Sequence, residues 1–121
     1  MVLLDANYIL RYLLNDNADM FRQAVQTIEN EECFVPGEVL GEVIYVLSGH
    51  YGVPRSEVAD VLEALLALPN LHSFEDGVYY EDALRLFAES SLDYVDCLLC
   101  SIGRDYRVAT FDKKLLRCLD K

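Results

Sequence analysis

Two acidic residues follow short segments of the kind that form buried strands. Asp5 ends the apolar run of residues 2–4, and Asp112 comes shortly after the segment of residues 107–109. An unbroken apolar run is typical of a strand buried on both faces of a parallel sheet. Because ligands bind beyond the carboxyl ends of such strands, we expect Asp5 and Asp112 to face one crevice. The alternative for Asp5 is that it only caps the helix that follows.

Three further acids belong to apolar helical patterns. Glu42 lies inside the pattern of residues 38–47, far enough from its ends that capping does not explain it. A very apolar helix is expected over residues 91–102, with two acids in or just before its first turn, Asp93 and, three positions later, Asp96. Acids at a helix start also serve as caps or favour the helix dipole, so both aspartates have an ordinary alternative. For Glu42 the alternative is a plain surface position.

A crevice that gathers four carboxylates needs a counter-charge. Like charges about 4 Å apart repel by about 1 kcal/mol in water and by more in a cleft, so protons or a cation must be bound. Oxygen ligands select a hard cation, and Mg²⁺ or Mn²⁺ held by a few carboxylates keeps coordination positions for substrate phosphates. A metal in such a site orients and acidifies water for attack at phosphorus, so the pattern predicts a phosphodiesterase.

The elements that would position these acids alternate along the chain. Strands are expected over residues 2–4, 32–35, 71–74 and 107–109, separated by helices, with the first two helices forming an antiparallel hairpin. This order predicts an α/β fold with a short parallel sheet flanked by helices. The length of 121 residues and a hydrophobic content of 53% suit one domain spanning residues 1–121.

The net charge of −11 argues against a protein that grips nucleic acid over a broad basic face. The basic residues are unevenly placed, however, and leave room for a local basic rim. Most of them gather near the carboxyl end, with one more on the first helix: Arg104, Arg107, Lys113, Lys114, Arg117, Lys121 and Arg11.

The four cysteines are Cys33, Cys97, Cys100 and Cys118, and all of them lie within helix or strand patterns. We interpret them as reduced, buried side chains of a cytosolic protein, because cytosolic thiols normally stay reduced. A zinc site is not expected, since it needs a full set of four ligands and the sequence has no second close cysteine pair. No apolar run reaches the roughly 20 residues that a membrane span requires.

The acidic residues and their surroundings, taken in order, resemble the PIN-domain family of metal-dependent nucleases. The resemblance covers residues 2–119 and is greatest to VapC-type toxins of toxin–antitoxin pairs. It is carried by four segments: VLLDANYILRYLL with Asp5, VLGEVIYVL with Glu42, LDYVDCLLC with Asp96, and ATFDKKLL with Asp112.

The resemblance implies a set of site residues. Asp5, Asp96 and Asp112 would bind Mg²⁺ or Mn²⁺, and Glu42 would join them in catalysis. Asp93 matches another frequently acidic position of the family, so the choice between Asp93 and Asp96 as the direct ligand stays open.

Beyond the acids, the resemblance implies a three-layer PIN-like fold with a parallel sheet of four or five strands and an RNA substrate. Asn7 and Thr110 match polar positions that support the acids. Arg11, Lys113 and Lys114 of the basic rim are the expected RNA contacts. A small basic antitoxin would block the site.

Two expectations concern assembly. We expect a homodimer, because Tyr45, Tyr51 and Phe87 are large side chains that a small core does not hide easily, and closed two-fold pairing is the default for such chains. We expect the inhibitory partner beside the first helices, with an apolar segment on Tyr8 or Tyr12. The net charge of −11 favours a basic partner.

Two other classes of protein remain. A receiver-like phosphoacceptor domain needs an aspartate at the end of a middle strand, whereas the middle strands expected here end in Val35 and Phe74. A PIN-like interaction module without catalysis has the same sequence features as an enzyme. Metal-dependent cleavage of single-stranded RNA separates such a module from a nuclease.

Overall fold

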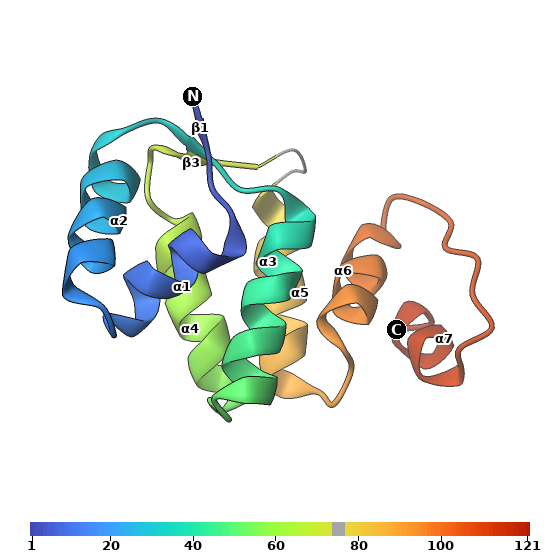
Figure 1. Ribbon diagram of the computed structural model, residues 1–121. Coiled ribbons are helices and arrows are strands. Elements are labelled where there is room, and N and C mark those ends of the chain that lie inside the picture. The colour runs from blue at the N-terminus through green and yellow to red at the C-terminus, as the bar shows by residue number, and fades with distance from the viewer. Residues whose placement is uncertain (74–76) are drawn as a thin grey trace.

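The computed structural model describes residues 1–73 and 77–121 and shows a helical body with short strands at one end (Figure 1). No described helix is both long and apolar enough to cross a bilayer. The elements, in chain order, are β1 (Val2–Leu3), α1 (Ala6–Leu14), α2 (Ala18–Asn30), β2 (Cys33–Phe34), α3 (Gly37–Tyr45), the π-helical turn η1 (Val46–His50), α4 (Arg55–Leu66), β3 (Leu71–His72), α5 (Gly77–Glu89), α6 (Tyr94–Ile102) and α7 (Lys113–Leu119).

The three strands form a parallel sheet in the order β1-β2-β3. Cys33 in the middle strand pairs with Val2 on one side and with Leu71 on the other. These strands confirm three of the expected segments, although Phe74, at the end of the third, lies outside the described residues. In the described sheet β1 is an edge strand, and Leu3 is 70% exposed.

The fourth expected strand, over residues 107–109, is not formed, so the described sheet does not reach four or five strands. Residues 103–112 instead run from α6 to α7 as an open connection away from the sheet (Figure 1). Arg107 and Ala109 are exposed, and only Val108 between them is half-buried. So little apolar burial does not offset the entropy of ordering a strand.

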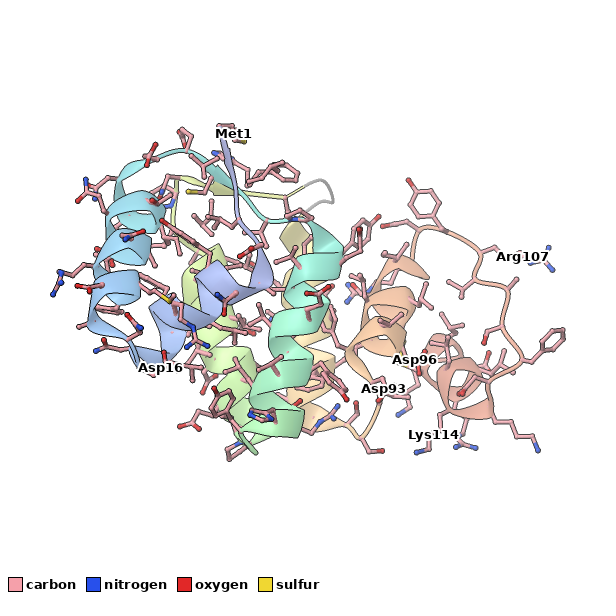
Figure 2. All side chains as sticks on the ribbon, in the orientation of Figure 1. Met1, Asp16, Asp93, Asp96, Arg107 and Lys114 are labelled. Carbon is pink, nitrogen blue, oxygen red and sulfur yellow. A yellow bond between two sulfur atoms is a disulfide. The ribbon has the colours of Figure 1, made fainter. Side chains whose placement is uncertain are left out.

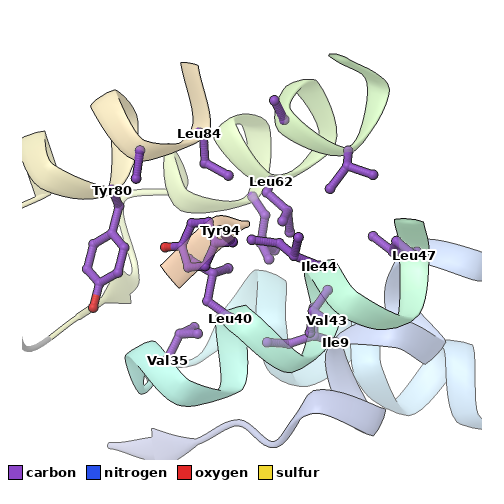
Figure 3. Close-up of a cluster of buried hydrophobic side chains, with 14 of the residues drawn as sticks. Ile9, Val35, Leu40, Val43, Ile44, Leu47, Leu62, Tyr80, Leu84 and Tyr94 are labelled. Carbon is purple, nitrogen blue, oxygen red and sulfur yellow. The ribbon is translucent and has the colours of Figure 1, made fainter. Parts of the chain in front are cut away.

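The helices share one hydrophobic core (Figure 3). Leu40, Val43 and Ile44 line one face of α3 and are at most 2% exposed. They lie in the same cluster as Leu62 of α4 and Leu84 of α5. Burying a side chain of this size contributes roughly 1.5–3 kcal/mol, so α3 is fixed in rotation about its axis.

The first two helices form the expected hairpin, and tyrosine hydroxyls connect them. Tyr8 Oη lies 2.7 Å from Thr27 Oγ1, and Tyr12 donates to Glu29 at 2.8 Å. The Tyr12 ring also stacks on Phe21, with 6.4 Å between the ring centroids. The hydroxyls of Tyr8 and Tyr12 are therefore hydrogen-bonded between the two helices of the hairpin. This hairpin is also where we expect the inhibitory partner to bind.

A disulfide joins α6 to α7. Cys100 and Cys118 are bonded with their Cα atoms 6.1 Å apart, so the expectation that every cysteine is reduced is wrong for this pair. Cys33 and Cys97 are free and buried, as expected. The sequence pattern did not reveal the pair because the packing of α7 on α6, which brings the two sulfurs together, is a tertiary contact.

Replacing Cys118 with Ser should lower the free energy of unfolding. The bridge spans a sequence separation of 18 residues, and closing a loop of that size restricts the unfolded chain by about 3 kcal/mol in the chain-entropy description. Urea denaturation of the oxidised wild type and of Cys118→Ser measures the difference. Dithiothreitol should bring the wild type to the variant's stability and leave the variant unchanged. Equal stability of the two oxidised proteins would contradict this.

Candidate active site

Asp5 lies immediately beyond β1 and caps α1. Its Oδ1 accepts a hydrogen bond from the Tyr8 backbone N–H at 2.8 Å. The ordinary capping role is thus present. The residue is exposed, and the bond involves one carboxylate oxygen, so capping leaves Asp5 able to bind a cation as well.

Glu42 is exposed on α3, because the core-facing side of that helix is taken by Leu40, Val43 and Ile44. It lines a groove of about 900 Å³ together with Asp93. We call this the α3–α6 groove, and its walls are mostly apolar. They include Gly41, Ile44, Tyr45, Val46, Phe87, Tyr94, Val95 and Leu98, with Glu38 among the acids.

Asp96 is half-buried in the first turn of α6, and its pKa lies above the usual range. Burial is the main cause, followed by the negative charges of Asp112 and Asp93. Figure 2 shows Asp93 and Asp96 at the start of α6, beside α7. The negative charges of Asp112 and Asp93 therefore both act on Asp96.

Two contacts hold Asp112 at the start of α7. Its Oδ1 accepts from the Leu115 backbone N–H at 3.0 Å, and its own backbone N–H donates to Thr110 Oγ1 at 3.0 Å. Thr110 therefore supports Asp112 directly. Asp93 occupies the capping position of α6, but its side chain makes no capping hydrogen bond.

Arg55 fixes the point where α6 begins. Its Nε donates to the Phe87 carbonyl at 2.7 Å, and a terminal nitrogen donates to the carbonyl of Leu92, next to Asp93. The guanidinium also lies 3.7 Å from the centroid of the Phe87 ring. The Arg55 side chain thus connects α4 to the end of α5 and to the segment before α6. These contacts hold the start of α6, and the acids on it, in place.

The five acids do not meet in a single cluster. The charges of Asp93 and Asp112 act on Asp96, whereas Asp5 borders a separate hollow beside β1, and Glu42 lies in the α3–α6 groove. In the two described ranges no three His, Cys, Asp or Glu residues are placed to hold a metal ion. The unformed strand explains the separation, because Asp112 stands on α7 rather than at the sheet edge. The donors suit a hard cation chemically, but the arrangement supplies too few of them.

The other expected site residues differ in what they contact. Arg11 makes two hydrogen bonds of 2.7 Å to Asp16, so its charge is already paired within the chain. Lys113 and Lys114 are exposed in the first turn of α7, next to Asp112. Asn7 is exposed in the first turn of α1.

Two features were missed from the sequence. The α3–α6 groove is one, and the exposed apolar residues Tyr45 and Val95 are its signal, since they fall off the core-facing side of their helices. The other is a buried acid, Asp82, which forms ion pairs with Arg85 at 3.2 Å and with Arg104. The spacing of Asp82 and Arg85 by three residues is a helical pairing signal.

Comparisons with known proteins agree with the resemblance carried by the four acidic segments. The sequence profile of the PIN domain family matches residues 2–118. A VapC ribonuclease of Aquifex aeolicus (strain VF5) is 29% identical over 107 residues, which cover 81% of this chain and 75% of that protein. No solved structure matches the chain significantly.

Asp96→Asn should stabilise the metal-free protein at neutral pH. Because the folded-state pKa of Asp96 is raised, ionising it removes stability as the pH rises above about 4. The amide avoids this loss, and we expect a gain below about 1 kcal/mol for a partly exposed group. The gain should appear as the pH rises through the raised pKa and then stay constant.

Urea denaturation between acidic and neutral pH, with EDTA present, measures this difference. Asp60→Asn is the matched control, because Asp60 is an exposed acid on α4. A gain for Asp96→Asn that is independent of pH, or equal to that of the control, would contradict the electrostatic grouping.

Proposed function

The chain belongs to the PIN domain family, and from this premise we propose that it is a metal-dependent endoribonuclease that hydrolyses RNA phosphodiester bonds. We propose further that it is the toxin of a toxin–antitoxin pair. The observation that carries the proposal is the position of Asp96, whose pKa is raised mainly by burial and further by the charges of Asp112 and Asp93. Carboxylates held in mutual repulsion bind a cation favourably. The similar protein from Aquifex aeolicus is named a VapC ribonuclease.

In this proposal Asp5, Asp96 and Asp112 hold Mg²⁺ or Mn²⁺, and Glu42 acts with them in catalysis. When bound, the metal would acidify a water and stabilise the charge on the leaving oxygen. Asp96 is a better candidate than Asp93 for binding the metal directly. Asp96 is the half-buried member of the pair, and its pKa is raised by burial and by the charges of Asp112 and Asp93.

The proposal includes a fourth strand over residues 107–109. The support is the exposed edge of β1 in the described sheet, where Leu3 is 70% exposed. Pairing of residues 107–109 with this edge would carry Asp112 toward Asp5. A bound cation would favour that arrangement, because it removes the repulsion between the acids.

Asp5→Asn should abolish RNA cleavage while leaving the apo protein at least as stable. The amide keeps the size and the capping ability of the side chain but removes one negative charge from the metal site. In the wild type, Mn²⁺ at a hundredfold excess over its Kd should raise the stability by roughly 2.7 kcal/mol, and Asp5→Asn should lose most of that gain. Melting curves with and without Mn²⁺, beside an RNA cleavage assay, give both readouts.

Asp60→Asn again serves as the control and should cleave RNA as the wild type does. Amide hydrogen exchange adds a readout that needs no RNA: Mn²⁺ should increase protection at residues 107–109 and in β1. If Asp5→Asn cleaves RNA normally and responds equally to Mn²⁺, Asp5 is only a helix cap and the assignment of the site fails. If the wild type cleaves no RNA, the chain is an interaction module with a PIN fold.

Assembly forms part of the proposal. The net charge of −11 attracts a small basic antitoxin. For the homodimer, the exposed side chains are Tyr45 at 76% and Tyr51 at 46%, whereas Phe87 is 3% exposed, so the expectation that Phe87 contributes is wrong. We place the dimer contact at the α3–α6 groove, where Tyr45 and Val95 are its exposed apolar side chains.

Tyr45→Asp should convert the dimer to a monomer. The substitution removes an exposed aromatic side chain and adds a negative charge to a groove that already contains Glu38, Glu42 and Asp93. Light scattering over a range of concentrations measures the mass. Val61→Asp, at a 36% exposed position on α4, is the control and should remain dimeric. A wild type that stays monomeric at high concentration would refute the dimer.

A further inference from the structure

The carboxyl-terminal end of the chain differs in charge from the rest of the molecule. We define residues 103–121, which comprise the connection after α6, α7 and the final residues, as the C-terminal arm. The arm contains six of the ten basic residues and three of the twenty-one acidic ones, so its formal charge is +3 against −14 for the remainder. A local basic surface therefore exists on an acidic protein.

The arm is attached to the body at both ends. At its start, Arg104 forms an ion pair with Asp82, and Tyr79 Oη donates to Asp105 at 2.7 Å. Near its end, Cys118 is bonded to Cys100 of α6. A segment held at both ends loses less conformational entropy when it binds a ligand than a free tail does.

Between these attachments most side chains are exposed, although Leu115 is buried. Phe111 is 102% exposed and Tyr106 is 65% exposed. Arg107, Lys113 and Lys114 are also exposed, and Figure 2 shows Arg107 and Lys114 projecting outward from the arm. A phenylalanine left in water forgoes roughly 1.5–3 kcal/mol of burial. The combination of bare aromatic rings and unburied cations indicates a ligand that offers both flat rings and negative charges.

Single-stranded RNA has this chemistry, since its bases stack on aromatic rings while its phosphates bind Lys and Arg. The charge distribution favours it over an anionic membrane. A membrane is a broad surface that would also face the body with its charge of −14, and such repulsion acts over a Debye length of about 8 Å. A single strand is narrow enough to contact the arm alone.

We propose that the C-terminal arm is a binding site for single-stranded RNA, in which a base stacks on Phe111 and the flanking phosphates contact Arg107, Lys113 and Lys114. The inference rests on the proposed ribonuclease function and specifies how that site takes its substrate. Phe111 directly precedes Asp112, so a base stacked there holds the adjoining phosphate beside the acids. Tyr106 is a second ring on the same connection.

Phe111→Ala should weaken binding of a short fluorescein-labelled oligouridine by about tenfold, because stacking on one aromatic side chain is lost. Fluorescence anisotropy in EDTA measures binding without cleavage. Phe111→Trp should bind at least as tightly as the wild type. Met20→Ala is the control, since Met20 is an apolar side chain that is 47% exposed on α2, outside the arm. The melting curve of Phe111→Ala should match the wild type, because the ring is 102% exposed and its removal loses no burial.

The phosphate contacts have a separate readout. Replacing Lys113 and Lys114 together with Gln should reduce the slope of log K against log salt by about 0.7 per residue. Arg22→Gln is the control, because Arg22 is an exposed residue of α2 paired with Asp19. Its salt slope should equal that of the wild type.

Some results would overturn the arm as the binding site. These are unchanged binding by Phe111→Ala, an unchanged salt slope in the double lysine variant, or stronger binding to phosphatidylserine vesicles than to the oligouridine. Equal affinity for an RNA duplex would overturn the stacking on Phe111. Cleavage by the wild type in Mn²⁺ is scored separately. If RNA binding depends on the arm but the wild type cleaves no RNA, the arm proposal stands and the ribonuclease proposal fails. If Phe111→Ala still cleaves RNA and binds it as tightly as the wild type, the ribonuclease proposal stands and the arm proposal fails.

Discussion

The burial of Asp96 beside the negative charges of Asp112 and Asp93 is the constraint on which the proposed chemistry depends. The three carboxylates are kept near one another because Arg55 fixes the start of α6 and a disulfide ties α7 to that helix. Burial of Asp96 then makes its ionisation less favourable.

The charge distribution is compatible with the polyanionic substrate proposed above. Net charge describes the whole surface, whereas a single strand of RNA contacts only a narrow part of it. The C-terminal arm has the opposite sign to the body and stands beside the acids that repel one another. Attraction at the arm and repulsion at the body would together orient a strand along the arm and away from the remaining surface.

Local sequence patterns identified most of the elements. Apolar periodicity located the helices, and short apolar runs located β1, β2 and β3. Capping marked the start of α1, because Asp5 Oδ1 accepts a hydrogen bond from the Tyr8 backbone N–H. The family was also recognisable from the four acidic segments, because their order and their placement on elements are properties of the sequence alone.

The sequence by itself thus determined the family, the helices, three strands and the residue types of the site, since each depends on neighbours a few positions away. The tertiary structure alone decided that residues 107–109 stay off the sheet, that Cys100 bonds to Cys118, and that Tyr45 is exposed while Phe87 is buried. It also decided that Asp96 is grouped with Asp112 rather than with Asp5. Each of these outcomes depends on packing between segments far apart in the chain, and local periodicity carries no information about which distant surfaces meet.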